Sequence, residues 1–568
     1  MVKIPYGTSN FGSLITQGYY YIDRTHFIVQ LEQLGEKYIA YLRPRRFGKS
    51  LWLSTLQHYY GLEYKNKFND LFGSQYIGKH PTPLANSFLV LKFDFSGIHT
   101  ETLHTTREGF VNKVKSGIGN FMAVYKEYFT EEEKKHILTH SDAHEMITRL
   151  SDHFRRQGGD SYIYILIDEY DHFANELISF RFSDYRDVVS RNGYVRKFYE
   201  AIKTATAEGI VDRIFLTGVS PITLDSFTSG FNISRNLTLD RGLQAMMGFT
   251  ESEVENLLLN IGISEAELPS IMADVKQWYD GYLFHSRAAE RLYNPDMVLY
   301  FAIEYQKEKR YPENILDTNV VSDYGKLQQL FRIGEVDEQH YEVIEALVEK
   351  REVSAKLTPQ FSFDRTFKRD DFVSLLFYMG MLTIREPHLR RIVFQFPNYV
   401  IEELYYQYFS EILLEKTRIS RSDIKLSEAV EQLAMQNNIL PFVAIVEKIL
   451  ISLSNRDSIG FDEKHIKAII VSLFHMVGIY TVKSEYETDR KYVDILLKER
   501  PPVKPNYTIA IELKYLPKSE TARLTSVKEE GVLQLKSYLQ HDELKRMPNL
   551  KGWLLVFVGT EARFVEPV

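Results

Sequence analysis

Two carboxylates and a lysine near the end of the chain have the residue types and the spacing for metal-assisted hydrolysis. Asp494 lies in an apolar, strand-like segment, and Glu512 and Lys514 lie in the next such segment. Side chains alternate along a strand, so Glu512 and Lys514 share a face. If the two segments pair as a hairpin, Asp494 lies beside Glu512, and the two carboxylates form a hard oxygen site for Mg²⁺ or Mn²⁺.

This set predicts hydrolysis of a phosphodiester bond. The metal would lower the pKa of a bound water and offset charge on the phosphate, while Lys514 positions that water or helps to deprotonate it. Glu463 on the preceding helix, or Glu485 on the preceding strand, could add an acidic ligand. Gln534 and Tyr538 stand at i and i+4 on a helix and could orient the lysine or contact the phosphate backbone. A salt-bridged sheet edge is the alternative explanation of the glutamate–lysine pair.

A second group of residues, far upstream, has the pattern of a phosphate-binding loop. The loop consists of Arg43, Pro44, Arg45, Arg46, Phe47, Gly48, Lys49 and Ser50. An apolar run precedes it, and helical spacing predicts a helix from Lys49 that stops at Gly61. Backbone N–H groups of such a loop surround the phosphates of ATP, the lysine supplies charge and the hydroxyl of Ser50 holds magnesium. Arg43 replaces the first glycine of GxxxxGK[ST], so the standard loop shape cannot be assumed.

The acidic partners of this loop are predicted at the end of a later strand. The apolar run over residues 162–167 ends at Asp168 and Glu169, which suit magnesium binding and the polarisation of an attacking water, respectively. Thr217 ends another apolar run and could sense the γ-phosphate, and the role of Asp94 is open. The alternative explanations are that residues 48–50 only begin a helix and that Asp168 and Glu169 are a solvated strand end. The candidates for an arginine finger are Arg45, Arg46, Arg191, Arg196 and Arg235.

The order of the elements predicts an α/β protein with several parts. Strands alternate with helices over residues 1–248, which predicts a mostly parallel, doubly wound sheet. Residues 249–395 are charged and mostly helical and predict a connecting or lid region. A helical linker over 396–459 precedes a final domain, 460–568, which begins with a helix that buries an apolar stripe.

Bulk composition excludes several functional classes. The 568 residues are 44% hydrophobic and 26% charged, with a net charge of −7, so nucleic-acid binding would need a local basic patch. The absence of cysteine excludes disulfides, cysteine nucleophiles and thiolate zinc sites. The start of the chain lacks a signal-peptide pattern, and the longest apolar stretch is interrupted by polar residues. These features predict a soluble, cytoplasmic protein without a membrane partner.

A histidine cluster was weighed as a metal site. His136, His140 and His144 have helical spacing, but Ser141 and Asp142 resemble a helix cap that would break the register. Metal binding is therefore not predicted there.

Several segments also carry a family resemblance. They resemble the AAA-ATPase-like family of bacterial proteins over residues 43–50, 167–171, 216–220, 278–282 and 293–295. Asp494, Glu512 and Lys514 resemble the PD-(D/E)xK nuclease domain that commonly ends those chains. The resemblance implies a P-loop NTPase domain followed by a restriction-endonuclease-like α/β domain, and it implies that the Arg43 replacement is usual for this loop.

Three functions remain open from the sequence. The first is an ATP-dependent or ATP-regulated nuclease that uses Mg²⁺ or Mn²⁺ and acts on nucleic acid, with DNA favoured over RNA. The second is a nucleotide-operated switch that binds nucleic acid without cutting it, and the third is an assembly protein with vestigial sites. A neighbouring subunit often supplies an arginine to P-loop ATPases, so a homo-oligomer is one hypothesis, although the sequence does not give the oligomeric state. A role in defence against foreign DNA follows only from the pairing of the domains.

Overall fold

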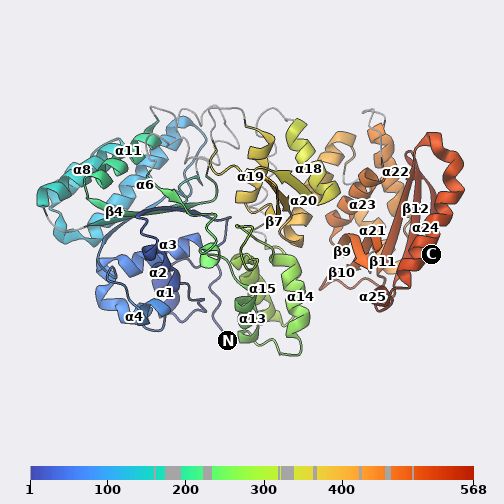
Figure 1. Cartoon of the computed structure of the whole chain (residues 1–568), viewed down its shortest axis with the longest axis horizontal. Helices are drawn as coiled ribbons and strands as arrows, with labels where there is room; N and C mark the ends of the chain where they lie inside the picture. The colour runs from blue at the N-terminus through green and yellow to red at the C-terminus, as the bar shows by residue number, and fades with distance from the viewer. Residues whose placement is uncertain are drawn as a thin grey trace. The chain divides into compact units, whose positions relative to one another are not determined.

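The computed structural model of the chain forms two compact units. One unit comprises residues 1–307, 316–343 and 352–399, and the other comprises residues 308–315, 344–351 and 400–568 (Figure 1). The structure describes residues 2–158, 162–172, 193–221, 233–317, 320, 338–361, 367–420, 425–454, 462–488 and 491–568.

A parallel sheet of five strands lies at the centre of the first unit, in the order β2-β3-β4-β1-β5. Its strands are β1 (Tyr38–Leu42), β2 (Leu89–Asp94), β3 (Ile163–Asp168), β4 (Val211–Gly218) and β5 (Arg235–Asn236). The predicted parallel sheet is confirmed. Because β1, β4 and β3 are adjacent and parallel, their carboxyl ends lie at one edge, where ligands bind in open α/β sheets.

Helices cover both faces of this sheet (Figure 1). One face carries α1 (Phe11–Thr16), α2 (His26–Gln33), α3 (Lys49–Tyr60), α4 (Phe68–Phe72) and α5 (Tyr76–Lys79). The other carries α6 (Leu103–Val124), α7 (Glu131–Leu138), α8 (Ala143–Gln157) and α11 (Tyr194–Ala207). Ile39 and Tyr41 of β1 join Trp52 and Leu56 of α3 in the core of the first face. Alternation along the strand thus fixes α3, and with it the loop that precedes the helix.

The rest of the first unit combines helices with a small sheet. Its helices are α13 (Glu251–Asn260), α14 (Leu268–Tyr279), α15 (Pro295–Glu308) and α19 (Arg369–Tyr378). Its three antiparallel strands, in the order β6-β8-β7, are β6 (Glu352–Ala355), β7 (Thr383–His388) and β8 (Arg391–Gln395). The sequence predicted a helical region here and missed this sheet, because the strands are short and their exposed ends carry arginine, glutamate, proline and histidine, which obscures the alternation.

The second unit contains a mixed sheet of five strands in the order β13-β12-β11-β10-β9. The strands are β9 (Tyr480–Thr488), β10 (Lys491–Glu499), β11 (Ile509–Leu516), β12 (Lys551–Val558) and β13 (Glu561–Pro567). The helices are α18 (Glu338–Lys350), whose second half lies in this unit, α20 (Tyr399–Thr417), α21 (Leu426–Gln436), α22 (Leu440–Ser454), α23 (Glu463–Val477), α24 (Leu524–Leu539) and α25 (Asp542–Lys545).

The predicted C-terminal α/β domain is confirmed. Strands β9, β10 and β11 run antiparallel, whereas β11 and β12 are parallel and joined through α24. The apolar stripe predicted on α23 is buried, with Ile466, Ile470 and Leu473 fully inside. Among the residues that the structure describes, no helix is both long enough and apolar enough to cross a membrane.

Candidate nucleotide and carboxylate sites

The loop between β1 and α3 ends in a left-handed glycine that opens the helix. Gly48 has a φ of 89° and caps α3, and no described atom lies within 4 Å of where its β-carbon would be. The glycine is therefore required by the backbone angle and not by crowding. The next residue, Lys49, is buried, and its Nζ donates a hydrogen bond to the carbonyl of Pro44 at 2.9 Å. Free N–H groups at the start of α3 and this ammonium offer an anion two kinds of donor.

Ser50 and Asp168 lie together, as the predicted magnesium site requires. The Ser50 hydroxyl hydrogen-bonds the Asp168 carboxylate. Burial raises the pKa of Asp168 above its usual value, while that hydrogen bond and the charges of Lys92 and Lys49 act in the opposite direction. Asp94 on β2 is in register with Asp168. A buried carboxylate beside a hydroxyl suits a magnesium ion, whose positive charge would offset the negative charge of Asp168.

Glu169 is held in a strained position at the end of β3. Its φ is 49°, an unusual value for a residue with a side chain. Its carboxylate lies 3.2 Å from Nδ1 of His172. Burial alone would raise the pKa of Glu169, but the hydrogen bond and charge of His172, with Lys49 and Arg45, outweigh it and lower the pKa to about 2. Glu169 is therefore ionised at neutral pH. Sequence reasoning missed His172, although it follows the acidic motif by three residues.

Arg43 faces the protein core. Its guanidinium donates hydrogen bonds to the carbonyls of Leu42 and Thr238 at 2.9 and 2.8 Å. It also stacks on the rings of Tyr41 and Phe284, 4.2 and 4.1 Å from their centroids. The side chain is 1% exposed, so Arg43 anchors the first residue of the loop and does not line the cavity described below. The predicted role of Arg43 in nucleotide binding is therefore limited to holding the loop in its conformation.

The other loop residues divide between the core and the cavity. Phe47 is buried edge-on against the ring of Tyr282, 5.0 Å between centroids. Arg46 has a φ of 65° and forms an ion pair of 3.0 Å with Asp296. Arg45 lines the cavity. The hydroxyl of Thr217 donates to the carbonyl of Tyr41 at 2.7 Å, so it joins β4 to β1.

Of the remaining arginine-finger candidates, two have acidic partners. Arg196 pairs with Glu200 on its own helix at 2.9 Å, and Arg235 pairs with Glu36. Arg191 lies outside the described residues.

A cavity of about 460 Å³ opens at this edge of the sheet, within the size range of small-molecule sites. Its walls include the loop residues 45–51, Glu169 and His172, residues 7–9 and 20–22 with Arg24 from the N-terminal segments, and residues 246–249. Arg24 in that wall donates a 2.6 Å hydrogen bond to Glu253. The sequence did not indicate the N-terminal segments, because they carry no phosphate-binding pattern. The lining combines cationic Arg45, Arg46 and Lys49 with Tyr20, Tyr21 and Met247, a mixture that suits a ligand with phosphates and an aromatic base.

The second site is formed by β10, β11 and α23. Ile495 pairs with Ile511, so Asp494 lies beside Glu512, as the hairpin prediction required. Oδ2 of Asp494 accepts a 2.9 Å hydrogen bond from the backbone N–H of Leu513. Oε1 of Glu512 lies 2.9 Å from Nζ of Lys514.

The other oxygen of Glu512 lacks a partner. Oε2 is buried and makes no hydrogen bond within the described part of the chain. Burial and the neighbouring charge of Asp494 raise the pKa of Glu512 to about 8, against the opposing charge of Lys514. A buried carboxylate oxygen without a donor is costly. A divalent cation bound to this oxygen would offset that cost, so the residues fit the metal ion predicted from the sequence.

Glu463 and Glu485, the two predicted additional acids, have different surroundings. Glu463 starts α23, accepts a hydrogen bond from the backbone of Tyr515, and has its pKa raised by burial, with Lys514 and Asp494 acting in opposite directions. It therefore borders the carboxylate pair. Glu485 instead bonds Nζ of Lys467 at 2.7 Å. Lys467, which sequence reasoning missed, also lies on α23.

Helix α24 brings Gln534 and Tyr538 toward the same strands. The pKa of Tyr538 is raised by burial and by the charge of Glu512. Oε1 of Gln534 is buried without a hydrogen-bond partner among the described residues. The close approach of α24 depends on Gly531, where a β-carbon would lie 2.6 Å from Leu554.

Two family models match the chain in these regions. Residues 5–228 match a family described as a predicted AAA-ATPase, and residues 461–566 match the PD-(D/E)XK nuclease superfamily. The chain carries an AAA-ATPase-like domain and a PD-(D/E)XK domain. The resemblance noted from the sequence is confirmed. The AAA-ATPase-like domain contains the loop, Asp168 and Glu169, and the PD-(D/E)XK domain contains Asp494, Glu512 and Lys514.

Two individual proteins are also similar. An uncharacterized protein in the vnfD 5′ region of Azotobacter chroococcum mcd 1 is 28% identical over 311 residues, 53% of this chain and 52% of that protein. The chain thus spans about half the length of this curated relative. Among solved structures, the Walker-type ATPase PABY2304 of Pyrococcus abyssi matches with a TM-score of 0.40 and 14% identity, over 68% of this chain and 96% of that one.

Proposed function

We propose that this protein binds and hydrolyses ATP with Mg²⁺ and that its PD-(D/E)XK domain cleaves phosphodiester bonds of nucleic acid, DNA in preference to RNA, with Mg²⁺ or Mn²⁺. The observation that carries the nuclease proposal is the buried Oε2 of Glu512, which has no hydrogen-bond partner among the described residues and lies beside Asp494. A buried carboxylate oxygen without a donor, beside a second carboxylate, is costly unless a cation binds there.

Each residue of the nuclease site has a distinct task. Asp494 and Glu512 would hold the metal, and Glu463 would complete the acidic wall. When bound, the metal supplies charge for the scissile phosphate and acidifies a water. Lys514, whose ammonium lies 2.9 Å from Oε1 of Glu512, would orient that water. Burial would lower the pKa of Lys514, but the charge and hydrogen bond of Glu512 outweigh burial and raise it, so the lysine stays protonated and does not take the proton itself. Tyr538 borders the same charges and could contact the phosphate backbone.

At the nucleotide site, Lys49 and the N–H groups at the start of α3 would bind the phosphates, and Ser50 with Asp168 would hold Mg²⁺. Glu169 is ionised at neutral pH and could therefore accept a hydrogen bond from the attacking water. Its contact with His172 involves Oε2 only, so the remaining acceptor positions of the carboxylate could bind the water while His172 holds the side chain.

The deciding experiment is cleavage of plasmid DNA, single-stranded DNA and RNA with Mg²⁺ or Mn²⁺, with and without ATP. Asp494→Ala should abolish cutting, whereas Asp542→Ala, which removes an exposed carboxylate of the same domain, should leave it intact. ATP hydrolysis should be lost in Lys49→Ala and kept in Lys79→Ala. ATP hydrolysis without cutting of any substrate would reject the nuclease proposal and favour a nucleotide-operated binding switch.

A further inference from the structure

The phosphate-binding loop carries two adjacent arginines, and both line the cavity at the edge of the sheet. Arg45 and Arg46 share that wall with Lys49, which we assign to the phosphates, and with Glu169, which we assign to the attacking water. In P-loop ATPases an arginine from the same chain or from a neighbouring subunit stabilises the charge of the transferred γ-phosphoryl group. The two loop arginines are therefore candidates for a source within this chain.

The backbone of the loop is held in place around Arg45. Nζ of Lys49 donates to the carbonyl of Pro44 at 2.9 Å, and Nδ2 of Asn294 donates to the carbonyl of Arg45 in a longer hydrogen bond of 3.5 Å. Asn294 is buried, and its Oδ1 accepts a 3.0 Å hydrogen bond from the N–H of Asp296 at the start of α15. The loop is thus attached to the beginning of that helix.

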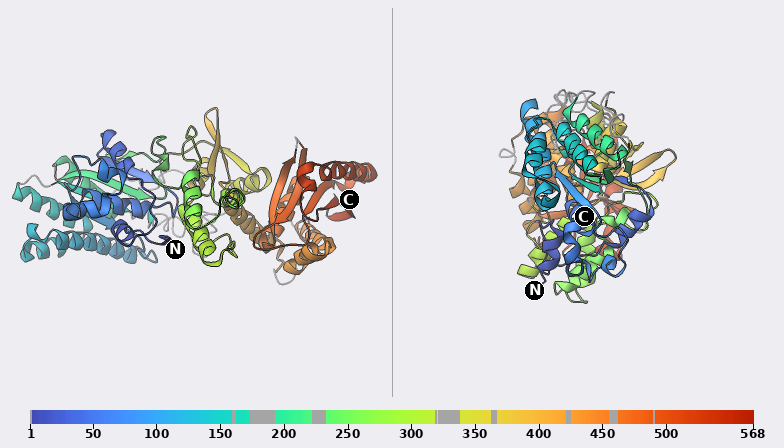
Figure 2. Two further views of the ribbon diagram at one scale, coloured as in Figure 1. Left: turned by 90° about the horizontal axis from the view of Figure 1, so that it is seen from below. Right: turned by 90° about the vertical axis from the view of Figure 1, so that its left-hand side faces the viewer.

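Arg46 is directed toward the same helix. Its Nη1 lies 3.0 Å from Oδ2 of Asp296, which is itself buried. Figure 2 shows the green helices α13 to α15 beside the dark-blue start of the chain, and residues from α15 and from that start both line the cavity. Separating a cation from a largely buried carboxylate leaves the carboxylate uncompensated, which is costly. Arg46 therefore serves to hold the loop against α15.

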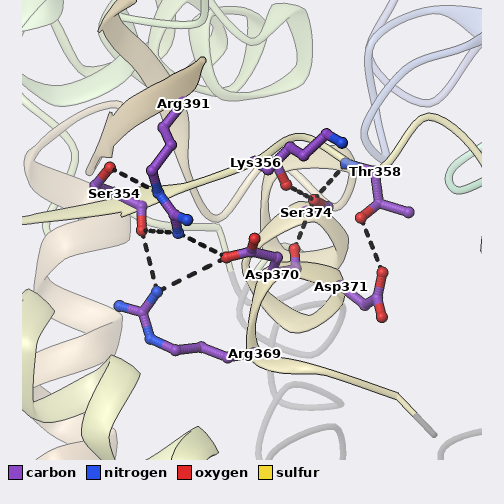
Figure 3. Close-up of polar contacts among 8 residues, drawn as sticks. All are labelled: Ser354, Lys356, Thr358, Arg369, Asp370, Asp371, Ser374 and Arg391. Atoms are coloured by element: carbon purple, nitrogen blue, oxygen red, sulfur yellow. Dashed lines mark hydrogen bonds and ion pairs between the residues drawn. The ribbon is translucent and has the colours of Figure 1, made fainter. Parts of the chain in front are cut away.

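The turn after α19 also supports the loop. Gly380 has a φ of 78°, and a β-carbon there would lie 2.7 Å from Cβ of Pro44, so only glycine allows this approach. Helix α19 is fixed in turn by Arg391 on β8, which donates to Asp370 at 2.8 Å and to the carbonyl of Ser354 on β6 at 3.0 Å (Figure 3). Pro44 therefore packs on a rigid neighbour, and the residue that follows it starts from a fixed backbone position.

The charge of Arg45 acts on the two groups that would take part in hydrolysis. Burial would raise the pKa of Glu169, and the charge of Arg45 is among the effects that lower it instead. Burial lowers the pKa of Lys49, and the charge of Arg45 acts in the same direction. A charge shifts the pKa of a neighbour mainly over a few ångströms. The guanidinium therefore lies near both side chains, in the wall where the γ-phosphate would be bound.

Two other arginine-finger candidates are engaged away from the cavity. Arg196 pairs with Glu200 and Arg235 pairs with Glu36. Neither arginine is part of the cavity wall. Of the candidates within the described part of the chain, Arg45 is thus the one whose position suits the γ-phosphate.

We propose that Arg45 is the catalytic arginine of ATP hydrolysis and that it acts in cis, on the nucleotide bound by its own chain. The inference rests on the proposed ATPase activity. In that reaction the oxygen of water bonds to the γ-phosphorus, the bond from this phosphorus to the bridging oxygen breaks, and ADP leaves with the electron pair. One water proton stays on the phosphate that is formed, and the other passes to solvent by way of Glu169. The Arg45 guanidinium binds the γ-phosphoryl oxygens and offsets their charge, so no neighbouring subunit is required.

The first test compares affinity for ADP with affinity for ADP plus aluminium fluoride, a mimic of the transferred phosphoryl group, using the full-length protein and Mg²⁺. Arg45→Ala should bind ADP within about threefold of the wild type but lose roughly 100-fold or more of its affinity for the mimic, and kcat should fall about 1000-fold. Arg45→Lys keeps the charge without the planar fork and should recover part of kcat. Arg287→Ala, which removes an exposed arginine elsewhere in the same unit, should change none of these quantities.

Two results of this comparison would overturn the proposal. An equal loss of both affinities in Arg45→Ala would show that the residue only supports the loop. A loss of affinity for the mimic in Arg46→Lys, with none in Arg45→Ala, would assign the catalytic role to Arg46.

The second test decides between an arginine of the same chain and one of a neighbour. Arg45→Ala protein is mixed with Lys49→Ala protein. If the arginine came from a neighbouring subunit, the intact Arg45 of the Lys49→Ala chain would complete the other chain's site, and the return of hydrolysis would overturn the proposal. In the cis arrangement the mixture stays inactive. Failure of the wild type to bind or hydrolyse ATP would reject the proposed function itself, whereas hydrolysis that persists in Arg45→Ala would reject this inference alone.

Discussion

Nζ of Lys467 lies 3.9 Å from Oδ1 of Asp494, so an ammonium group stands beside a carboxylate that we assign to the metal. Lys467 is largely buried and is bound to Glu485 at 2.7 Å, which keeps it in place. A resident cation at this distance stabilises the carboxylate when no metal is bound. It also repels an incoming divalent ion.

The first prediction follows from that repulsion. Lys467→Met should raise the affinity for Mn²⁺ by roughly tenfold, because a neighbouring positive charge of this kind costs an incoming cation about 1 kcal/mol or more. Isothermal titration calorimetry of the full-length protein measures the effect. Lys464→Met, an exposed lysine on the same helix, is the matched control and should leave the affinity unchanged. Weaker binding in Lys467→Met would show that Lys467 instead serves to position Asp494.

The second prediction concerns pH. Glu512 has a pKa raised to about 8, so below that pH a proton must leave before the metal binds. Metal affinity should therefore rise by up to about tenfold per pH unit below pH 8 and level off above it. Titrations at pH 6, 7, 8 and 9 test this, and Glu512→Gln should bind metal weakly at every pH. An affinity that does not change from pH 6 to 8 would mean that Glu512 is already ionised.

Much of this architecture was readable from residue spacing. The parallel sheet, the loop before α3, and the hairpin that places Asp494 beside Glu512 all follow from local patterns with few alternatives. The directions in which the side chains point do not follow from these patterns. Arg43 occupies a glycine position in the motif, and only the packing of Tyr41 and Phe284 shows that it faces the core.

The features that the sequence did not predict depend on contacts between distant segments. The N-terminal segments become a wall of the cavity only through tertiary packing, and Lys467 reaches Glu485 and Asp494 only because α23 packs against β9 and β10. The β6-β8-β7 sheet was missed because its hairpin lacks both a clear alternation and a glycine or asparagine turn.

The third prediction tests how the end of β4 is held. Asp171 accepts hydrogen bonds from the N–H groups of Val219 and Ser220, and a β-carbon at Gly218 would lie 2.1 Å from its Oδ1. Gly218→Ala should therefore destabilise the protein by about 1 to 3 kcal/mol. Gly119→Ala is the control, since that glycine lies in α6 with no described atom within 4 Å of the added carbon, and should be neutral or stabilising. Thermal unfolding compares the two variants.

The fourth prediction concerns an ionic cluster of the second unit. His465 on α23 lies 3.3 Å from Glu349 and 2.8 Å from Asp462, and hydrogen bonds with Glu345 and Asp462 raise its pKa to about 9, against the effect of burial. Glu345, Glu349 and His465 lie close enough together to hold a metal ion, but a protonated His465 already offsets the negative charge of the carboxylates.

Because the folded pKa exceeds the usual value of about 6.5, the stability that His465 contributes is complete below pH 6.5 and is lost as the pH rises through 9. His465→Gln should therefore lower the melting temperature at pH 6 more than at pH 10, where the two proteins should converge. The partial exposure of the cluster keeps the effect modest. Zn²⁺ added at pH 7 should not raise the melting temperature of the wild type through this cluster, and a Zn²⁺ stabilisation that disappears in His465→Gln would show that a metal takes the place of the proton.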